Sequence, residues 1–173
     1  MVQNFDPSLP EVYGDAAALE RVFVNLIRNA LEAIAMAPAT HLHTIRLHTA
    51  IESQLRLSVH GRRRQYLRVE ITDSGKGMTA AEAKQLFTPF FTTKSSGTGL
   101  GLVLSQRVVA LHGGKLWAER GGIDPKTAHG HGVNSDAPDF PARSDRGPGN
   151  DAAPQRRQIR GMTFNVMLPV GPR

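Results

Sequence analysis

The segment between Asp15 and Ala37 limits what this chain can fold into more than any other part of the sequence. Its apolar residues recur at steps of three and four, the spacing that places side chains on one face of an α-helix. They are Leu19, Phe23, Leu26, Ile27, Ala30, Leu31 and Ile34. Gly14 precedes this run and Pro38 follows it, which sets the two ends. The sequence therefore predicts one long amphipathic helix.

Alternation of apolar and polar residues predicts strands in four further segments. These segments are 45–59, 67–71, 115–119 and 162–168. The charged run at 60–65 is typical of a hairpin tip between the first two strands. A short helix is expected after Thr79, where Glu82 can complete a capping box. A third helix is expected over 102–111, and the following His112–Gly114 offers a glycine for a left-handed cap.

The chain has 173 residues, a length typical of one domain, or of one domain with an excursion. The excursion is expected at 121–160, where glycine and proline are frequent and large apolar residues are few. Such a composition buries too little apolar surface to offset the entropy lost on ordering. We therefore predict a single domain over 1–173, with a flexible Gly/Pro-rich insertion at 121–160 inside it.

The formal net charge of +6 and the lack of cysteine exclude several classes of protein. Without cysteine the chain has no disulfides and no thiolate metal sites. No apolar run reaches the ~18 residues of a membrane-spanning helix, so we expect a cytoplasmic domain without membrane contact of its own. The basic residues are spread over loops and are not interleaved with aromatic residues, so no nucleic-acid partner is expected.

Two asparagines, Asn25 and Asn29, lie four residues apart in the predicted long helix. This spacing puts both carboxamides on one helical face. An asparagine oxygen can bind a hard cation without adding charge, which suits a metal that already bridges phosphates. The alternative is a pair of polar residues on a solvated face.

A glycine-rich turn, Asp73–Gly77, follows the second predicted strand. A carboxylate at a strand end can accept a hydrogen bond from an exocyclic amine, and glycines let the backbone approach a flat ring closely. The alternative is a tight turn in which Asp73 caps its own backbone.

A second glycine-rich loop, Gly97–Gly101, directly precedes the third predicted helix. Free backbone N–H groups at a helix start favour an anion, and Lys94 can add a point charge for phosphates. The aromatic cluster of Phe87, Phe90 and Phe91 can close over a ligand. The alternatives are a flexible loop, a solvated lysine and aromatic anchors to the core. No metal site is predicted among the seven histidines.

Taken in order, these segments resemble the four motif boxes of sensor histidine kinases. The N box, first glycine box, F box and second glycine box correspond to Asn25–Ala30, Asp73–Gly77, Phe87–Lys94 and Gly97–Gly101. The segments 112–117 and 161–164 resemble the remaining strand landmarks of the same ATP-binding domain. The resemblance covers about 9–119 and 161–170.

The resemblance implies the Bergerat (GHKL) ATP-binding fold. This fold is an α+β two-layer sandwich, with a mixed, mainly antiparallel sheet and helices on one face. It also implies ATP and Mg²⁺ as ligands, and phosphoryl transfer mostly requires positioning and charge neutralisation of such groups.

By the family's pattern, Asn29 coordinates Mg²⁺ and Asn25 lies nearby at the phosphates. Asp73 accepts from the adenine amine, Thr163 lies at the back of the adenine pocket, and Lys94 acts with the two asparagines in catalysis. The other residues expected to contact ATP are Gly75, Gly77, Met78, Phe91, Thr93, Gly97, Thr98, Gly99, Leu100, Gly101 and Leu102.

The sequence departs from the family's pattern in two ways. Lys76 stands where proline is more usual, at a position that should tolerate it. The dimerisation helices with the phosphoacceptor histidine are missing, so we expect a catalytic fragment. Its partners would be a histidine-bearing dimerisation domain of the same kinase and a response regulator. The region 45–59 with its basic hairpin is faintly similar to nitrogen-regulation sensor kinases.

Three other functions remain compatible with the sequence. Anti-sigma serine kinases resemble this fold and are single short domains, although the segment 88–94 is more typical of histidine kinases. Gyrase-like and chaperone ATPases place a glutamate general base where Asn25 stands, so ATP hydrolysis by this chain alone should be poor. The third is a nucleotide-binding interaction module without catalysis.

Overall fold

We describe the fold from a computed structural model of the chain. It describes residues 1–38, 43–54, 64–94, 97–121 and 161–171. Most of the predicted hairpin tip at 60–65, and all but the first residue of the predicted insertion at 121–160, lie outside these residues. Among the described residues, no helix is long and apolar enough to cross a membrane.

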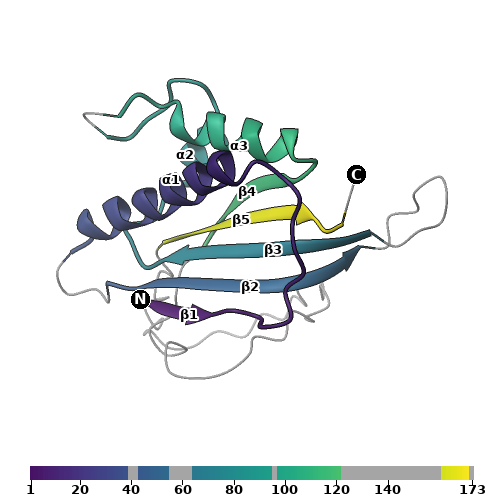
Figure 1. Cartoon of the computed structure of the whole chain (residues 1–173). Helices are drawn as coiled ribbons and strands as arrows, with labels where there is room; N and C mark the ends of the chain where they lie inside the picture. Colours follow the sequence, from purple (N-terminus) through teal and green to yellow (C-terminus); the bar gives the residue numbers. More distant parts are fainter. Residues whose placement is uncertain (39–42, 55–63, 95–96, 122–160, 172–173) are drawn as a thin grey trace, which may run out of the picture.

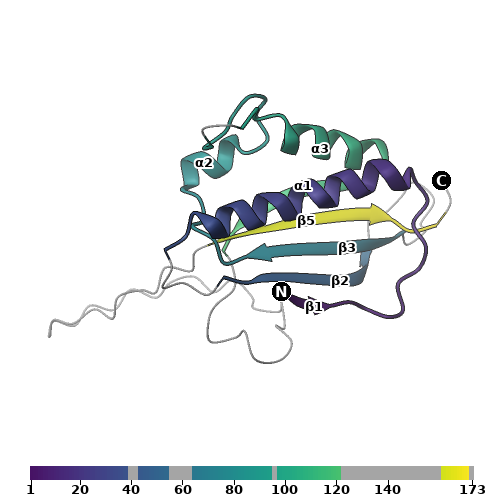
Figure 2. The same ribbon diagram turned by 60° about the vertical axis from the view of Figure 1, so that its left-hand side comes forward.

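Within the described residues, five strands form one sheet, and helices cover one of its faces (Figures 1 and 2). Along the chain the elements are β1 Val2–Asn4, α1 Ala16–Ala35, β2 Ile45–Gln54, β3 Arg64–Asp73, α2 Ala80–Gln85, α3 Gly101–Leu111, β4 Lys115–Arg120 and β5 Met162–Pro169. The strand order is β1-β2-β3-β5-β4. The β1–β2 pair is parallel and the other three pairs are antiparallel. The predicted α+β sandwich with a mixed, mainly antiparallel sheet is confirmed.

Helix α1 forms as its periodicity predicts. The Asp15 side chain caps it by accepting a hydrogen bond from the Ala18 N–H at 3.0 Å. The helix ends at Ala35, shortly before Pro38, because proline disfavours helical geometry in the residue that precedes it. Its buried stripe consists of Val22, Leu26, Ala30 and Ile34. Apolar side chains of β3 and β5 complete the core beneath this stripe.

The ends of the other two helices also follow the sequence signals. The capping box between Thr79 and Glu82 is present at the start of α2. After α3, Gly113 adopts the expected left-handed conformation, with φ of 73°. His112 at this end donates from Nδ1 to the Val108 carbonyl, and its Nε2 accepts from the Asp15 N–H at 2.9 Å. One imidazole thus joins the end of α3 to the start of α1.

The middle strand β3 is longer than its predicted core of 67–71. It pairs with β2 along its whole length, from Arg64 opposite Gln54 to Asp73 opposite Ile45. Polar residues alternate with the apolar ones because the outer face of the sheet carries a charged network. Arg68 lies at its centre and contacts Glu52, Glu70 and Asn165. The predicted extension of the first strand to residue 59 lies outside the described residues.

Candidate functional site

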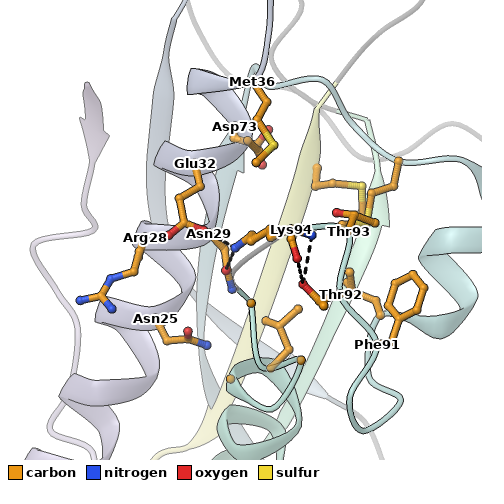
Figure 3. Close-up of a pocket in the computed structure, with 18 of the residues that line it drawn as sticks. Asn25, Arg28, Asn29, Glu32, Met36, Asp73, Phe91, Thr92, Thr93 and Lys94 are labelled. Carbon is orange, nitrogen blue, oxygen red and sulfur yellow. Dashed lines mark hydrogen bonds and ion pairs between the residues drawn. The ribbon is translucent and has the colours of Figure 1, made fainter.

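A cavity of about 500 Å³ lies between α1, the turn after β3, the lid segment (residues 87–94) and the start of α3 (Figure 3). This volume is within the range of small-molecule sites. Thirteen of the residues predicted to bind ATP line it. They are Asn25, Asn29, Asp73, Gly77, Met78, Phe91, Thr93, Lys94, Gly97, Thr98, Gly99, Gly101 and Leu102.

One end of the cavity contains a buried carboxylate. Asp73 ends β3 and is 1% exposed. It accepts backbone hydrogen bonds from Gly75, at 2.8 Å, and from Met162. Burial raises the pKa of Asp73 to about 6, although the two backbone N–H donors act in the opposite direction. A carboxyl in this position suits a neutral or positive hydrogen-bond donor on a ligand.

The walls beside Asp73 are apolar. They are formed by Ala33 of α1 and its C-cap Met36, by Met78 and Leu86, and by Met162 and Phe164 of β5. A flat apolar ring with an amino group at one edge can therefore be buried here, because the walls exclude water and Asp73 accepts from the amine.

The other end of the cavity is polar and carries the two asparagines on one face of α1, as their spacing predicts (Figure 3). The Asn25 amide donates to the buried Ser105 hydroxyl of α3 at 3.0 Å. The Asn29 carbonyl oxygen accepts from the Lys94 ammonium at 2.7 Å. Lys94 also forms an ion pair with Glu32.

The glycine loop brings the start of α3 to this polar end. Helix α3 begins at Gly101, and its N-cap Leu100 makes no side-chain capping bond, so the first-turn N–H groups are left to other acceptors. Gly99 adopts a φ of 67° and its carbonyl accepts from the Phe90 N–H at 3.1 Å. Phe90 itself has a φ of 66°, an unusual value for a residue with a side chain. The loop and the lid segment are thereby tied together, and the helix start suits an anion.

The residues at the polar end can hold a hard cation only if most of its ligands come from outside the protein. Among the described residues, no group of three or more His, Cys, Asp or Glu side chains is arranged to hold a metal ion. The carbonyl of Asn29, however, already faces a cation, the ammonium of Lys94. A divalent ion that receives most of its ligands from phosphate oxygens and water needs only one such protein oxygen.

Three residues predicted to contact ATP do not line the cavity. Thr163 points to the opposite face of the sheet, where its hydroxyl bonds the Thr72 hydroxyl at 3.1 Å and the Gly121 carbonyl at 3.0 Å. Because side chains alternate along a strand, its neighbour Met162 lines the pocket instead. Gly75 packs against α1 and Leu100 is the N-cap of α3; neither is among the residues that line the cavity.

Several lining residues are absent from the sequence-based prediction. Arg28 and Glu32 of α1, with the C-cap Met36, extend the face that carries the two asparagines. The spacing of Glu32, three residues after Asn29, was a signal that could have found it. Met162 and Phe164 follow from the strand alternation on either side of Thr163.

The raised pKa of Asp73 predicts an unusual dependence of stability on pH. Its ordinary value of 3.8 rises to about 6 in the fold, so the folded state holds this proton more tightly than the unfolded state. The contribution of protonated Asp73 to the free energy of unfolding is complete below about pH 4 and is lost as the pH rises through 6. The total loss is about 3 kcal/mol. Urea unfolding of the chain and of Asp73→Asn at pH 4.5 and 7.5 measures the difference. Equal pH dependence in both proteins would contradict the assignment.

Comparisons with known proteins agree with this geometry. The family described as "Histidine kinase-, DNA gyrase B-, and HSP90-like ATPase" matches residues 14–172. The chain is 41% identical over 121 residues to "Sensory histidine kinase/phosphatase NtrB" of Rhodobacter capsulatus, covering 69% of this chain and 33% of that protein. It is also 41% identical over 117 residues to NtrB of Rhizobium leguminosarum, covering 66% and 30%. The chain thus spans about a third of the length of these curated relatives.

Solved structures show the same fold. The mycobacterial sensor histidine kinase MprB superposes with a TM-score of 0.57 at 21% identity, covering 99% of this chain and 84% of that one. A nucleotide-free form of the catalytic domain of histidine kinase ThkA superposes with a TM-score of 0.55 at 22% identity, covering 99% and 80%. With its family match over nearly the whole length, the chain belongs to the histidine kinase-, DNA gyrase B- and HSP90-like ATPases.

Proposed function

We propose that this domain binds Mg²⁺-ATP in the cavity and donates the γ-phosphoryl group to a histidine on a dimerisation domain outside this chain. The observation that carries the proposal is the division of the cavity into two ends. A buried carboxylate with apolar walls occupies one end, and two carboxamides, a lysine and a helix start occupy the other. This division matches a molecule with a flat amino-bearing ring and a polyanionic tail.

The Asp73 end would bind adenine. The ionised carboxylate accepts from the exocyclic amine, and the flanking methionines and Phe164 cover the ring. The two backbone N–H groups that donate to Asp73 fix its orientation before ligand arrives. Such preorganisation lowers the cost of binding. Gly77 lines this end without a side chain and leaves room for the ring edge.

The polar end would bind the phosphates. The first-turn N–H groups of α3 and the Lys94 ammonium supply positive charge, while Asn29 offers its oxygen to Mg²⁺ and Asn25 lies beside it. Bound Mg²⁺ neutralises charge on the phosphate oxygens during transfer. Ser105 holds the Asn25 amide, which fixes the direction of its carbonyl oxygen.

We expect little transfer to water, because the pocket that the structure describes offers little to activate a water molecule. The carboxylates that line it are Asp73, at the ring end, and Glu32, which is paired with Lys94. A general base must reach the proton it abstracts; Asp73 lies away from the phosphate end, and Glu32 is held by Lys94 in the empty site. The name of the NtrB relatives, sensory histidine kinase/phosphatase, supports a histidine as acceptor. We propose further that a response regulator receives the phosphoryl group next, in the cytoplasm.

Transfer of label tests this proposal. The domain is mixed with γ-labelled ATP, Mg²⁺ and a separately produced dimerisation domain of an NtrB relative. We expect label on the acceptor that is stable in base and lost in acid, as a phosphohistidine is, and no label on an acceptor whose histidine is replaced by glutamine. Acid-stable label would favour a serine kinase. No label despite measured ATP binding would contradict kinase activity toward this class of acceptor.

A further inference from the structure

The lysine of the lid segment is held at the polar end by two residues of α1. The Lys94 ammonium donates to the Asn29 carbonyl oxygen at 2.7 Å and forms an ion pair with Glu32 (Figure 3). Asn29 and Glu32 are three residues apart, so their side chains lie on one helical face. The side chains of Lys94 and Glu32 are 30% and 40% exposed, so the pair is only partly screened by water.

This arrangement conflicts with what the same residues would do when a nucleotide is bound. A carbonyl oxygen that accepts from an ammonium at 2.7 Å cannot also bind a divalent ion along the same direction. The Lys94 ammonium likewise has to leave Glu32 in order to contact the phosphates. The empty site and the loaded site therefore need two different positions of Lys94.

We infer that Glu32 is a positioning residue that holds Lys94 against Asn29 while the site is empty. A divalent cation that arrives with the phosphates then replaces the ammonium at the Asn29 carbonyl oxygen. The inference rests on the proposed function, because the exchange needs a metal-bound nucleotide at Asn29. Lys94 serves as an internal stand-in for the metal, and Glu32 neutralises its charge. Once released, the ammonium moves from the carboxylate to the phosphate oxygens, and no covalent bond changes.

The ion pair between Lys94 and Glu32 lowers the affinity for nucleotide, because binding has to break this partly exposed pair. A pair of this kind contributes up to about 1 kcal/mol, which corresponds to about a fivefold change in an equilibrium constant. Glu32→Gln keeps the size of the side chain and removes its charge. It should therefore release Lys94 and tighten nucleotide binding by about fivefold.

A thermodynamic cycle separates this effect from simple repulsion between Glu32 and phosphates. Affinities for a non-hydrolysable ATP analogue with Mg²⁺ are measured by calorimetry for the original chain, Glu32→Gln, Lys94→Met and the double variant. If Glu32 acts by holding Lys94, the gain from Glu32→Gln shrinks at least about threefold when Lys94 is already absent. An equal gain in both backgrounds would overturn the inference.

Trypsin provides a readout that needs no nucleotide. Cleavage after Lys94 requires this side chain to enter the specificity pocket of the protease. The ion pair with Glu32 therefore protects the peptide bond after Lys94. In the absence of ligand we expect Glu32→Gln to be cut there about threefold to fivefold faster. The matched control Glu20→Gln, on the exposed side of α1, should be cut at the original rate. An unchanged rate of cleavage in Glu32→Gln would contradict the inference that Glu32 holds Lys94 in the empty site. Failure of every protein to bind nucleotide contradicts the proposed function, whereas the cleavage rates still decide whether Glu32 holds Lys94.

Discussion

Asp73→Asn is expected to weaken binding of ATP by about 10- to 100-fold. This is the loss of affinity expected when a buried hydrogen bond to a charged group is removed. The carboxylate accepts from the Gly75 and Met162 N–H groups, so an asparagine amide in its place would oppose one of these donors with a donor of its own. The adenine amine then meets a site that no longer offers an ionised acceptor. Titration calorimetry at pH 7.5, with ATP and Mg²⁺, measures the loss.

A variant on the same strand provides the control for Asp73→Asn. Glu70→Gln removes a carboxylate from the outer face of β3, where Glu70 pairs with Arg68. It should leave the affinity for ATP within about twofold of the original, because surface charges away from the site contribute little. Binding of ATP to Asp73→Asn at the original affinity, with thermal unfolding that shows a folded protein, would remove Asp73 from the adenine site.

Gly75→Ala is expected to destabilise the fold by about 3 kcal/mol, a large part of the stability of a domain. A Cβ at this position would lie 2.6 Å from the Ala33 carbonyl carbon and 2.7 Å from its oxygen. Both are backbone atoms of α1, and the Lys76 N–H donates to the same oxygen at 3.2 Å. The turn after β3 would have to move away from the helix and would take Asp73 with it. Urea unfolding measures the loss.

Gly113→Ala separates this steric effect from backbone strain. Gly113 has a positive φ of 73°, but the nearest atom to its hypothetical Cβ is 3.5 Å away. The alanine there suffers only the cost of the left-handed conformation, about 1 kcal/mol. If Gly113→Ala were as damaging as Gly75→Ala, close approach to α1 could not be the cause.

The sequence was most informative where a signal was local. The spacing of Asn25 and Asn29 placed both at one cavity because helical geometry depends only on neighbouring residues. Thr79 and Gly113 likewise act within their own turn, and each is found in its predicted capping role. Helix α1 begins where it was predicted to, with Asp15 as its N-cap.

The sequence was least informative where the result depends on elements far apart in the chain. Thr163 was expected in the pocket from its place in a motif, but which face of β5 turns inward is decided by its pairing with β3. The position of Lys94 on Glu32 depends on how the lid segment folds over α1, and no periodicity reports that contact. The parallel pairing of β1 with β2 also arises from a crossover through α1, which no local pattern specifies.

The strand order has a consequence for how this domain is made. The last described strand, β5, lies between β3 and β4. Until residues 162–169 have been synthesised, β4 therefore has no partner in the sheet and β3 is paired on one side only, with β2. A nascent chain that has already emerged through β4 exposes the free edge of β3 and the unpaired strand β4, and such edges are templates for association with other chains. Ribosome-bound fragments that end before residue 162 should therefore be more prone to aggregation and to chaperone capture than the finished chain.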